Sequence, residues 1–184
     1  MRILLDIDGV VADLLPYWLE LINRYYGERL LLDEITCWEV HKFCKNAKPE
    51  QIYSFFEEPG FFLHLDPVPG SLTAVNQLLA TGHEIVFVTA CNAGHSDKRR
   101  WVQRHFPNFN LENIVFAERK ELIKGDIFVD DNVDNVRAYQ LEHPGALAVC
   151  FAAPHNRDYA GLRIRNLQGL FILLANCQNQ KGEI

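Results

Sequence analysis

Residues 1–11, MRILLDIDGVV, join an unbroken apolar run to two carboxylates that stand one residue apart. The absence of alternation at residues 3–5 is typical of a strand buried on both faces of a parallel sheet. Asp6 and Asp8 follow directly, and Gly9 turns the chain away. Ligands of open α/β sheets bind at the carboxyl ends of strands, and two carboxylates this close repel each other unless a cation or a shared proton relieves them. Taken alone, the stretch fits a solvated turn equally well.

Length and composition describe an ordinary globular chain with a modest negative charge. Its 184 residues suffice for one α/β domain with a small insert, and 48% of them are apolar. The net charge of −6 argues against a nucleic-acid duplex or an anionic membrane as partner. We expect no signal peptide and no membrane-spanning segment.

The five cysteines are odd in number and form no CxxC pair, which suits reduced thiols in a cytoplasmic protein. Cys37, His41 and Cys44 could share one face of a helix as zinc ligands. Because no fourth ligand is apparent, we expect these three residues to pack rather than to bind a metal.

The order of apolar runs and helical patterns predicts a doubly wound, mostly parallel α/β sheet of the Rossmann type. Residues 12–65 are rich in aromatics and show no second strand, so we interpret them as a small helical cap. The cap interrupts a core of residues 1–11 and 66–184, in which strands alternate with helices. Further strands are expected at 84–89, 113–117, 126–131 and 146–151, and core helices at 71–80, 96–106, 135–142 and 164–176.

Three of the predicted strands end in polar groups that can converge on one point. Asp6 and Asp8 end the first strand, Thr89 ends the second, and Asp130 and Asp131 end the fourth. Four carboxylates with no basic residue beside them in sequence form an oxygen-rich site, and such a site suits Mg²⁺.

The segment after the second predicted strand completes this pattern. Residues 90–94 are small, and with the N-terminus of the next helix they can present N–H groups to an anion. Lys120 or Lys124, shortly before the fourth strand, could supply a positive charge. Metal, hydroxyl, N–H groups and lysine together indicate a site for phosphoryl transfer.

These residues resemble the haloacid dehalogenase superfamily of phosphohydrolases. The matching motifs occur in the family's order: Asp6-Ile-Asp8-Gly9-Val10, then Thr89, then a lysine, then Asp130-Asp131. Within the superfamily the chain most resembles the pyrimidine-type 5′(3′)-deoxyribonucleotidases and their bacterial and phage relatives. The supporting fragments are Ile35-Thr-Cys-Trp38, Trp101-Val102, His105-Phe106-Pro107, Lys120-x-x-x-x-Gly125-Asp126, Asp130-Asp131-Asn132 and Pro154-His-Asn-Arg157.

The resemblance implies a role for each acidic residue. Asp6 would be the nucleophile that becomes an aspartyl-phosphate. Asp8 would protonate the leaving alkoxide and then activate water, and its presence argues against a dehalogenase. Mg²⁺ would be held by Asp6, the main-chain carbonyl of Asp8 and Asp130, with Asp131 supporting them from behind.

The resemblance also implies a set of phosphate-binding groups. Thr89 and the Ala90 N–H would bind the phosphoryl oxygens together with a lysine. Lys120 stands ten residues before Asp130, as in the deoxyribonucleotidases, whereas Lys124 stands six before it and is expected to be a solvated surface residue.

The cap would close over a small molecule, and one of its residues matches a known base-binding position. Trp38 corresponds to the family's base-stacking tryptophan, although the cap core is the alternative location for it. Stacking on an aromatic ring is worth about 1–3 kcal/mol per base. Leu14 and Cys37 stand where the relatives carry aromatics, and Glu39 adds a nearby acid. The resemblance therefore implies a thinner aromatic clamp.

We expect a Mg²⁺-dependent phosphomonoesterase that acts on nucleoside monophosphates, in particular deoxyribonucleotides. A capped phosphatase for another small metabolite is the alternative, because one fold hosts many specificities. A non-catalytic nucleotide-binding protein of the same fold is less favoured, since Asp8 and the acidic pair are both intact.

Overall fold

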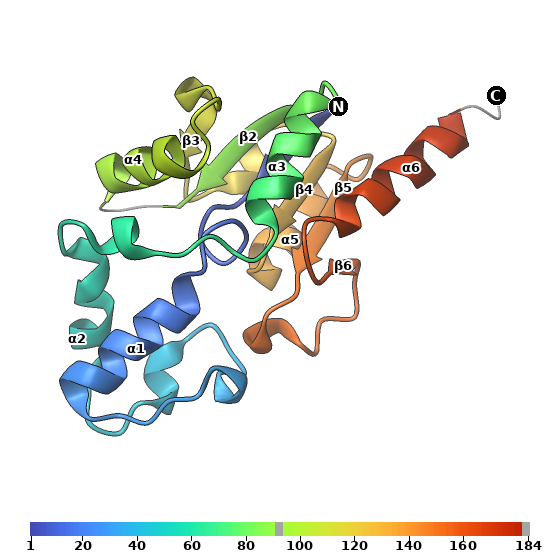
Figure 1. Cartoon of the computed structure of the whole chain (residues 1–184). Coiled ribbons are helices and arrows are strands. Elements are labelled where there is room, and N and C mark those ends of the chain that lie inside the picture. The colour runs from blue at the N-terminus through green and yellow to red at the C-terminus, as the bar shows by residue number, and fades with distance from the viewer. Residues whose placement is uncertain (91–93, 182–184) are drawn as a thin grey trace.

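A six-stranded parallel sheet organises the molecule (Figure 1). The computed structural model describes residues 1–90 and 94–181. Within them the strand order is β3-β2-β1-β4-β5-β6. The strands are β1 (Arg2–Leu5), β2 (Glu84–Thr89), β3 (Ile114–Phe116), β4 (Ile127–Asp130), β5 (Leu147–Phe151) and β6 (Arg163–Ile164). The chain therefore builds outward from β1 to one side and then crosses to the other, which confirms the predicted doubly wound fold.

Strand β1 lies in the middle of the sheet because its residues are apolar on both faces. Leu4 stands in register with Val86 of β2 and with Phe128 of β4. Ile3 and Leu5 are also fully buried, on the opposite face from Leu4. A one-residue slip would exchange these two faces, so the packing fixes which residues end the strand.

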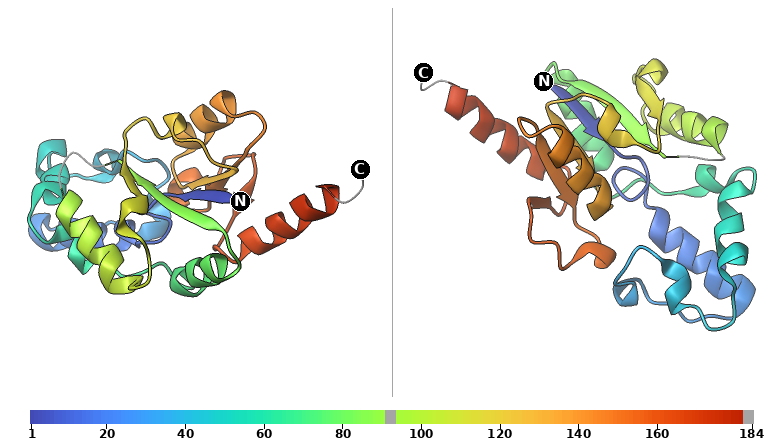
Figure 2. Two further views of the ribbon diagram at one scale, coloured as in Figure 1. Left: turned by 90° about the horizontal axis from the view of Figure 1, so that it is seen from above. Right: turned by 180° about the vertical axis from the view of Figure 1, so that it is seen from behind.

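Helices cover both faces of the sheet, as the left view of Figure 2 shows. Helices α3 (Ser71–Ala80), α4 (His95–His105) and α6 (Gly169–Lys181) contribute to the larger apolar core, which contains Ile3 and Leu5. Helix α5 (Val133–Glu142) covers the other face through Val136 and Tyr139. The Tyr139 ring stacks on Phe128 with centroids 4.4 Å apart.

The segment between β1 and α3 is helical, as predicted. It contains α1 (Leu14–Tyr26), α2 (Pro49–Tyr53) and the short 3₁₀ helices η1 (Leu32–Glu34), η2 (Val40–Phe43), η3 (Ser54–Glu57) and η4 (Phe61–His64). Trp18 is buried among these helices and donates its indole N–H to the Ile52 carbonyl at 2.8 Å. The apolar core of this segment is continuous with the core of the sheet.

The two chain crossings between this segment and the sheet lie against each other. The Val68 N–H donates to the Val11 carbonyl at 2.9 Å, and the Asp13 N–H donates to the Asp66 carbonyl at 2.8 Å. The crossings coincide with the predicted boundaries at residues 11/12 and 65/66. The division of the chain into cap and core stays a prediction.

The structure differs from the sequence prediction at the C-terminal end of the sheet. Arg163 and Ile164 form a sixth strand beside β5, and the last helix begins at Gly169 rather than at Ile164. A two-residue strand is too short to show any periodicity, so its apolar residue is indistinguishable in sequence from the start of the helix that follows. No helix in the described ranges is long and apolar enough to cross a membrane.

A glycine next to the acidic motif provides a test of how tightly this turn is packed. Gly9 has φ +76°, and a Cβ on it would lie 2.2 Å from Oδ2 of Asp131. Gly27 has φ +65°, and a Cβ added there would meet no atom within 4 Å. We expect Gly27→Ala to lower the free energy of unfolding by about 1 kcal/mol, the cost of left-handed backbone alone. Gly9→Ala should lower the free energy of unfolding by clearly more, because the Asp131 side chain must also move.

Urea unfolding of both variants and of the wild type measures the difference. Equal losses at the two glycines would contradict the close approach of Gly9 to Asp131.

Candidate active site

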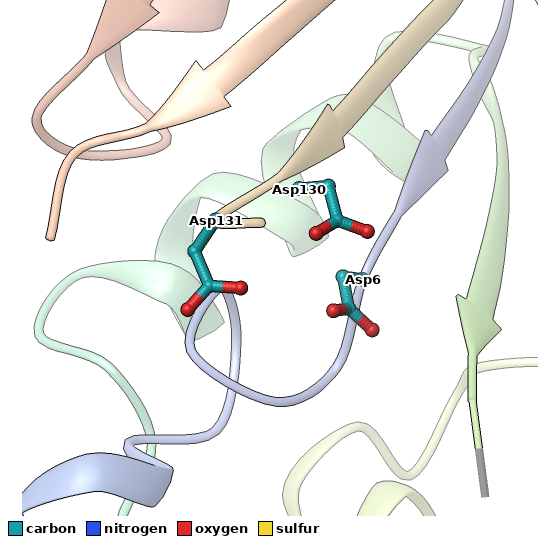
Figure 3. Close-up of side chains that lie close together, drawn as sticks. All are labelled: Asp6, Asp130 and Asp131. Atoms are coloured by element: carbon teal, nitrogen blue, oxygen red, sulfur yellow. The ribbon is translucent and has the colours of Figure 1, made fainter. Parts of the chain in front are cut away.

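Three buried carboxylates meet at the carboxyl ends of β1 and β4 (Figure 3). Asp6 directly follows β1, Asp130 ends β4, and Asp131 is the next residue. Each offers an oxygen within 4.8 Å of the others. Because β1 and β4 are neighbours, and the Asp6 N–H donates to the Val129 carbonyl at 2.9 Å, the strand pairing itself sets this convergence.

The alternative zinc group does not assemble. His41 contacts the Tyr53 hydroxyl through Nδ1 at 3.2 Å, and the Cys44 thiol donates to the Val40 carbonyl at 3.7 Å. Across residues 1–90 and 94–181, the acidic cluster is the one group of His, Cys, Asp and Glu side chains close enough to share a metal ion.

Lys120 is the lysine that reaches this cluster. It begins the 3₁₀ helix η6 (Lys120–Leu122), and only 2% of its surface is exposed. Its Nζ lies 2.7 Å from Oδ2 of Asp6 and 2.7 Å from Oδ2 of Asp130. Lys124, the alternative, is exposed. The phosphate-binding role given to Lys120 stays a prediction, but its position fits that role and the position of Lys124 does not.

Burial controls the charge state of the cluster. It raises the pKa of Asp6 to about 7, against the opposing charge of Lys120 and with the support of the Asp130 and Asp8 carboxylates. Burial alone would lower the pKa of Lys120, but the Asp130 and Asp6 carboxylates raise that pKa above its ordinary value. Lys120 therefore stays charged. A further cation nearby would stabilise the ionised form of Asp6.

The two acids at the end of β4 have different hydrogen-bond partners. Asp130 accepts the Asn132 backbone N–H on Oδ1 at 2.8 Å. Its Oδ2 accepts Lys120 at 2.7 Å and the Asn135 amide at 3.1 Å. Both oxygens of Asp130 thus accept N–H donors, and Asp130 shares the ammonium group of Lys120 with Asp6.

Asp131 differs from Asp130 in the hydrogen bonding of one carboxylate oxygen. Its Oδ2 lies 3.3 Å from Nε2 of His155, whereas its buried Oδ1 has no hydrogen-bond partner among the described residues. A buried oxygen without a donor is costly unless it binds a cation or a proton. The oxygen-only donor set therefore fits a hard divalent ion such as Mg²⁺. The unpaired Oδ1 makes Asp131 a candidate ligand beside Asp130, which also anchors Lys120. The assignment of the ligand to Asp130 stays a prediction.

A second buried lysine, which no sequence motif indicated, lies beside the other acid. Lys98 of α4 is 1% exposed and contacts Oδ2 of Asp8. Its Nζ also donates to the Thr89 hydroxyl at 2.8 Å and to the Ala90 carbonyl at 3.1 Å. Asp8, Thr89 and Ala90 thus lie together as predicted, whereas the N–H groups expected from residues 91–93 lie outside the described residues.

A cavity of about 510 Å³ joins these groups to the helical segment. This volume is within the usual range for a small-molecule site. Asp6, Asp8, Lys98, Lys120 and Asp131 line its polar end. Its apolar wall comes from Leu14, Trp38, Tyr53, Phe56 and Phe62.

The cavity wall differs in part from the predicted clamp. Trp38 is 45% exposed and meets the His155 ring edge-on at a centroid distance of 5.0 Å, so it is not in the cap core. Tyr53 and Phe56, two further aromatics of the helical segment, add to the wall. Glu39 pairs with Lys42 at 2.8 Å and does not line the cavity. The glutamates that do line the cavity are Glu57 and Glu118.

The fold is similar to that of solved hydrolases of the haloacid dehalogenase (HAD) superfamily. A HAD hydrolase of family IA, variant 3, from Entamoeba histolytica matches with TM-score 0.57 and 14% identity, over 91% of this chain and 94% of the other. A HAD-hydrolase from Bacillus subtilis, solved bound to magnesium, matches with TM-score 0.58 and 13% identity, over 95% and 98%. The chain thus shares the fold of this class of hydrolases.

The sequence comparisons narrow this class to one family. The chain belongs to the family described as 5′ nucleotidase, deoxy (pyrimidine), cytosolic type C, whose sequence profile matches residues 1–180. A 5′(3′)-deoxyribonucleotidase from Bacillus subtilis (strain 168) is 30% identical over 158 residues, covering 85% of this chain and 87% of the relative. The human cytosolic type is 31% identical over 167 residues, covering 85% and 82%. The predicted family and enzyme class, a phosphoric monoester hydrolase, are confirmed.

The unequal surroundings of Asp130 and Asp131 give a direct test. We expect Asp131→Asn to abolish most Mn²⁺ binding, because it removes the carboxylate whose buried oxygen accepts no N–H donor from the described residues. Asp130→Asn should weaken binding less, since its oxygens already accept N–H donors. Mn²⁺ titration followed by electron paramagnetic resonance measures both affinities. A greater loss for Asp130→Asn than for Asp131→Asn would support the assignment predicted from the sequence.

Proposed function

We propose that this protein hydrolyses deoxyribonucleoside monophosphates, through an aspartyl-phosphate intermediate and with Mg²⁺ as cofactor. The observation that carries the proposal is the cavity that joins Asp6, Asp8 and Lys120 to an aromatic wall. Its polar end offers a nucleophile, an acid and a cation, and its apolar end offers surfaces on which a nucleobase can stack. The deoxyribonucleotidase relatives support this choice of substrate.

Asp6 and Asp8 would divide the chemistry between them. An Asp6 carboxylate oxygen attacks phosphorus, and the bond from phosphorus to the ester oxygen breaks. Asp8 gives its proton to the leaving alkoxide, so that the nucleoside departs as an alcohol. Asp8, now a carboxylate, then takes a proton from a water molecule, which attacks phosphorus and releases inorganic phosphate from Asp6.

The surrounding groups would stabilise the charge on the phosphoryl oxygens. Lys120 holds the nucleophile at 2.7 Å and brings a positive charge to the phosphoryl group. The Thr89 hydroxyl and the Ala90 N–H would donate hydrogen bonds to the phosphoryl oxygens. Asp6, the Asp8 carbonyl and either Asp130 or Asp131 would hold Mg²⁺, which supplies further neutralisation of the phosphate charge when bound.

The apolar wall would select the substrate. Trp38 presents an exposed ring at the cavity, and Tyr53 and Phe56 extend the surface beyond it. Glu57 and Glu118 add negative charge at the cavity, which disfavours a substrate with a second phosphate group. A cytoplasmic location remains the prediction from the sequence.

Removing the nucleophile tests the proposal. Asp6→Asn should reduce Mg²⁺-dependent release of phosphate from dUMP and from p-nitrophenyl phosphate to trace levels, because no carboxylate remains to attack phosphorus. Asp134→Asn, at a 90%-exposed side chain, is the matched control and should keep wild-type activity. EDTA should inactivate the wild type. Sustained turnover by Asp6→Asn would rule out the aspartyl-phosphate route.

Substrate choice is tested at the aromatic wall. Trp38→Ala should lower kcat/KM for dUMP roughly ten-fold or more, from about 1–3 kcal/mol of lost stacking, and should hardly change p-nitrophenyl phosphate hydrolysis. Tyr25→Ala, at an exposed aromatic residue of α1, is the control and should leave both substrates unaffected.

The same assay compares dUMP, dTMP, dCMP and dGMP with a sugar phosphate. The nucleotidase proposal would be contradicted if the wild type preferred the sugar phosphate, or if Trp38→Ala left kcat/KM for the nucleotides unchanged. Either result would favour a phosphatase for another metabolite.

A further inference from the structure

Lys98 has no role in the mechanism above, yet it is among the most completely buried side chains of the chain. It lies in the first turns of α4, on the same face as the buried Trp101 and Val102. Burying an ammonium group is costly unless its charge is paired and its hydrogens are bonded. The burial of the Lys98 ammonium group therefore needs a specific explanation.

The ammonium group is fully satisfied by three acceptors. Its Nζ donates to Oδ2 of Asp8, to the Thr89 hydroxyl at 2.8 Å and to the Ala90 carbonyl at 3.1 Å. A lysine has three N–H donors, so none is left for a phosphoryl oxygen. The Phe62 ring lies 4.6 Å from the same Nζ and adds a cation–π contact from the cap side.

We propose that Lys98 is a positioning residue that fixes the carboxyl group of Asp8 for proton transfer. Lys98 holds Oδ2, while Oδ1 of Asp8 is buried, has no partner among the described residues and belongs to a side chain that lines the cavity. Oδ1 is thus the oxygen left to carry the proton. This inference rests on the proposed function, in which Asp8 is the acid and base.

The same contact serves both steps of the reaction. An ammonium N–H can donate to Oδ2 when Oδ1 carries a proton and also when it does not. Lys98 is held in turn by the rigid helix α4, because Trp101 packs beside it and donates its indole N–H to the Leu65 carbonyl at 2.8 Å. The carboxyl group therefore does not have to find its orientation again after each transfer.

Lys98→Met removes the N–H donors and retains most of the side-chain volume. We expect it to lower kcat for dUMP about 100-fold, the lower end of what a positioned general acid contributes, with little change in KM. Hydrolysis of p-nitrophenyl phosphate should fall less than about ten-fold, because its leaving group departs without a proton. Arg100→Met, at a 65%-exposed side chain on the same helix, is the matched control and should behave as wild type.

A double-mutant cycle with Asp8→Asn separates positioning from phosphate binding. If Lys98 acts through Asp8, Lys98→Met should cost almost nothing further in the Asp8→Asn background. Additive losses, equal losses on both substrates, or a raised KM at unchanged kcat would each overturn the proposal in favour of direct phosphate binding.

Thermal unfolding accompanies each variant, and Lys98→Gln replaces Lys98→Met in the cycle if the latter does not fold. Failure of both variants to fold would assign Lys98 to the structure alone and overturn the inference. An inactive wild type would instead refute the proposed function, so the two failures are distinguishable.

Discussion

Mutual repulsion among carboxylates at the ends of two neighbouring strands governs the arrangement of the site. The strand pairing brings three of them together in a buried place, where charge is poorly screened, and Asp8 follows two residues after Asp6. Two buried lysines oppose them, and with all six groups ionised a formal charge of −2 remains, which one divalent cation would balance. The six residues are Asp6, Asp8, Asp130, Asp131, Lys98 and Lys120. Without such a cation, burial holds the pKa of Asp6 at about 7.

Each of the two lysines offsets the negative charge of different carboxylates. Lys120 bridges Asp6 to Asp130 and so ties the residue after β1 to the end of the neighbouring strand. Lys98 approaches from α4 and pairs with Asp8, next to Thr89 at the end of β2. Each lysine therefore joins an acid of the first motif to the end of an adjacent strand. The geometry of the motif depends on the sheet register as much as on its own sequence.

The strand-end acids were predictable from the sequence because their signal is local. An apolar run without alternation followed by two aspartates needs no tertiary information, and the same holds for the end of β4. The different surroundings of Asp130 and Asp131 could not be predicted from adjacent residues of the same type. Only the N–H donors around each carboxylate, which come from Asn132, Asn135 and distant segments, distinguish the two.

Lys98 escaped prediction although the sequence holds a signal for it. It stands three residues before Trp101 and four before Val102, so it shares the apolar face of a helix that is otherwise rich in basic residues. The charge run around it is more typical of a solvated surface. The cavity aromatics Tyr53 and Phe56 carry no comparable signal, because the helices that hold them are too short to separate a core face from a cavity face.

The helical segment between β1 and α3 contributes Phe62 and Trp38 to the cavity, and the two are anchored to different parts of the sheet domain. The segment of Phe62 is held to α4, where the Gly60 N–H donates to Asp97 at 2.6 Å and Arg104 donates to the Leu63 carbonyl at 3.1 Å. Trp38 rests edge-on against His155 in the loop after β5.

Arg157 of that same loop donates to the Asp33 carbonyl at 2.7 Å and anchors the segment that leads to the tryptophan. The contacts that position Asp8 and Lys98 thus run through α4, while the contacts that position Trp38 run through the loop after β5. The loop also reaches the acids, because His155 lies 3.3 Å from Oδ2 of Asp131 and the Asn156 amide donates to the Asp131 carbonyl at 2.7 Å. A substitution at His155 therefore alters the surroundings of Trp38 and of Asp131 together, whereas a substitution at Arg157 acts on the segment that leads to Trp38.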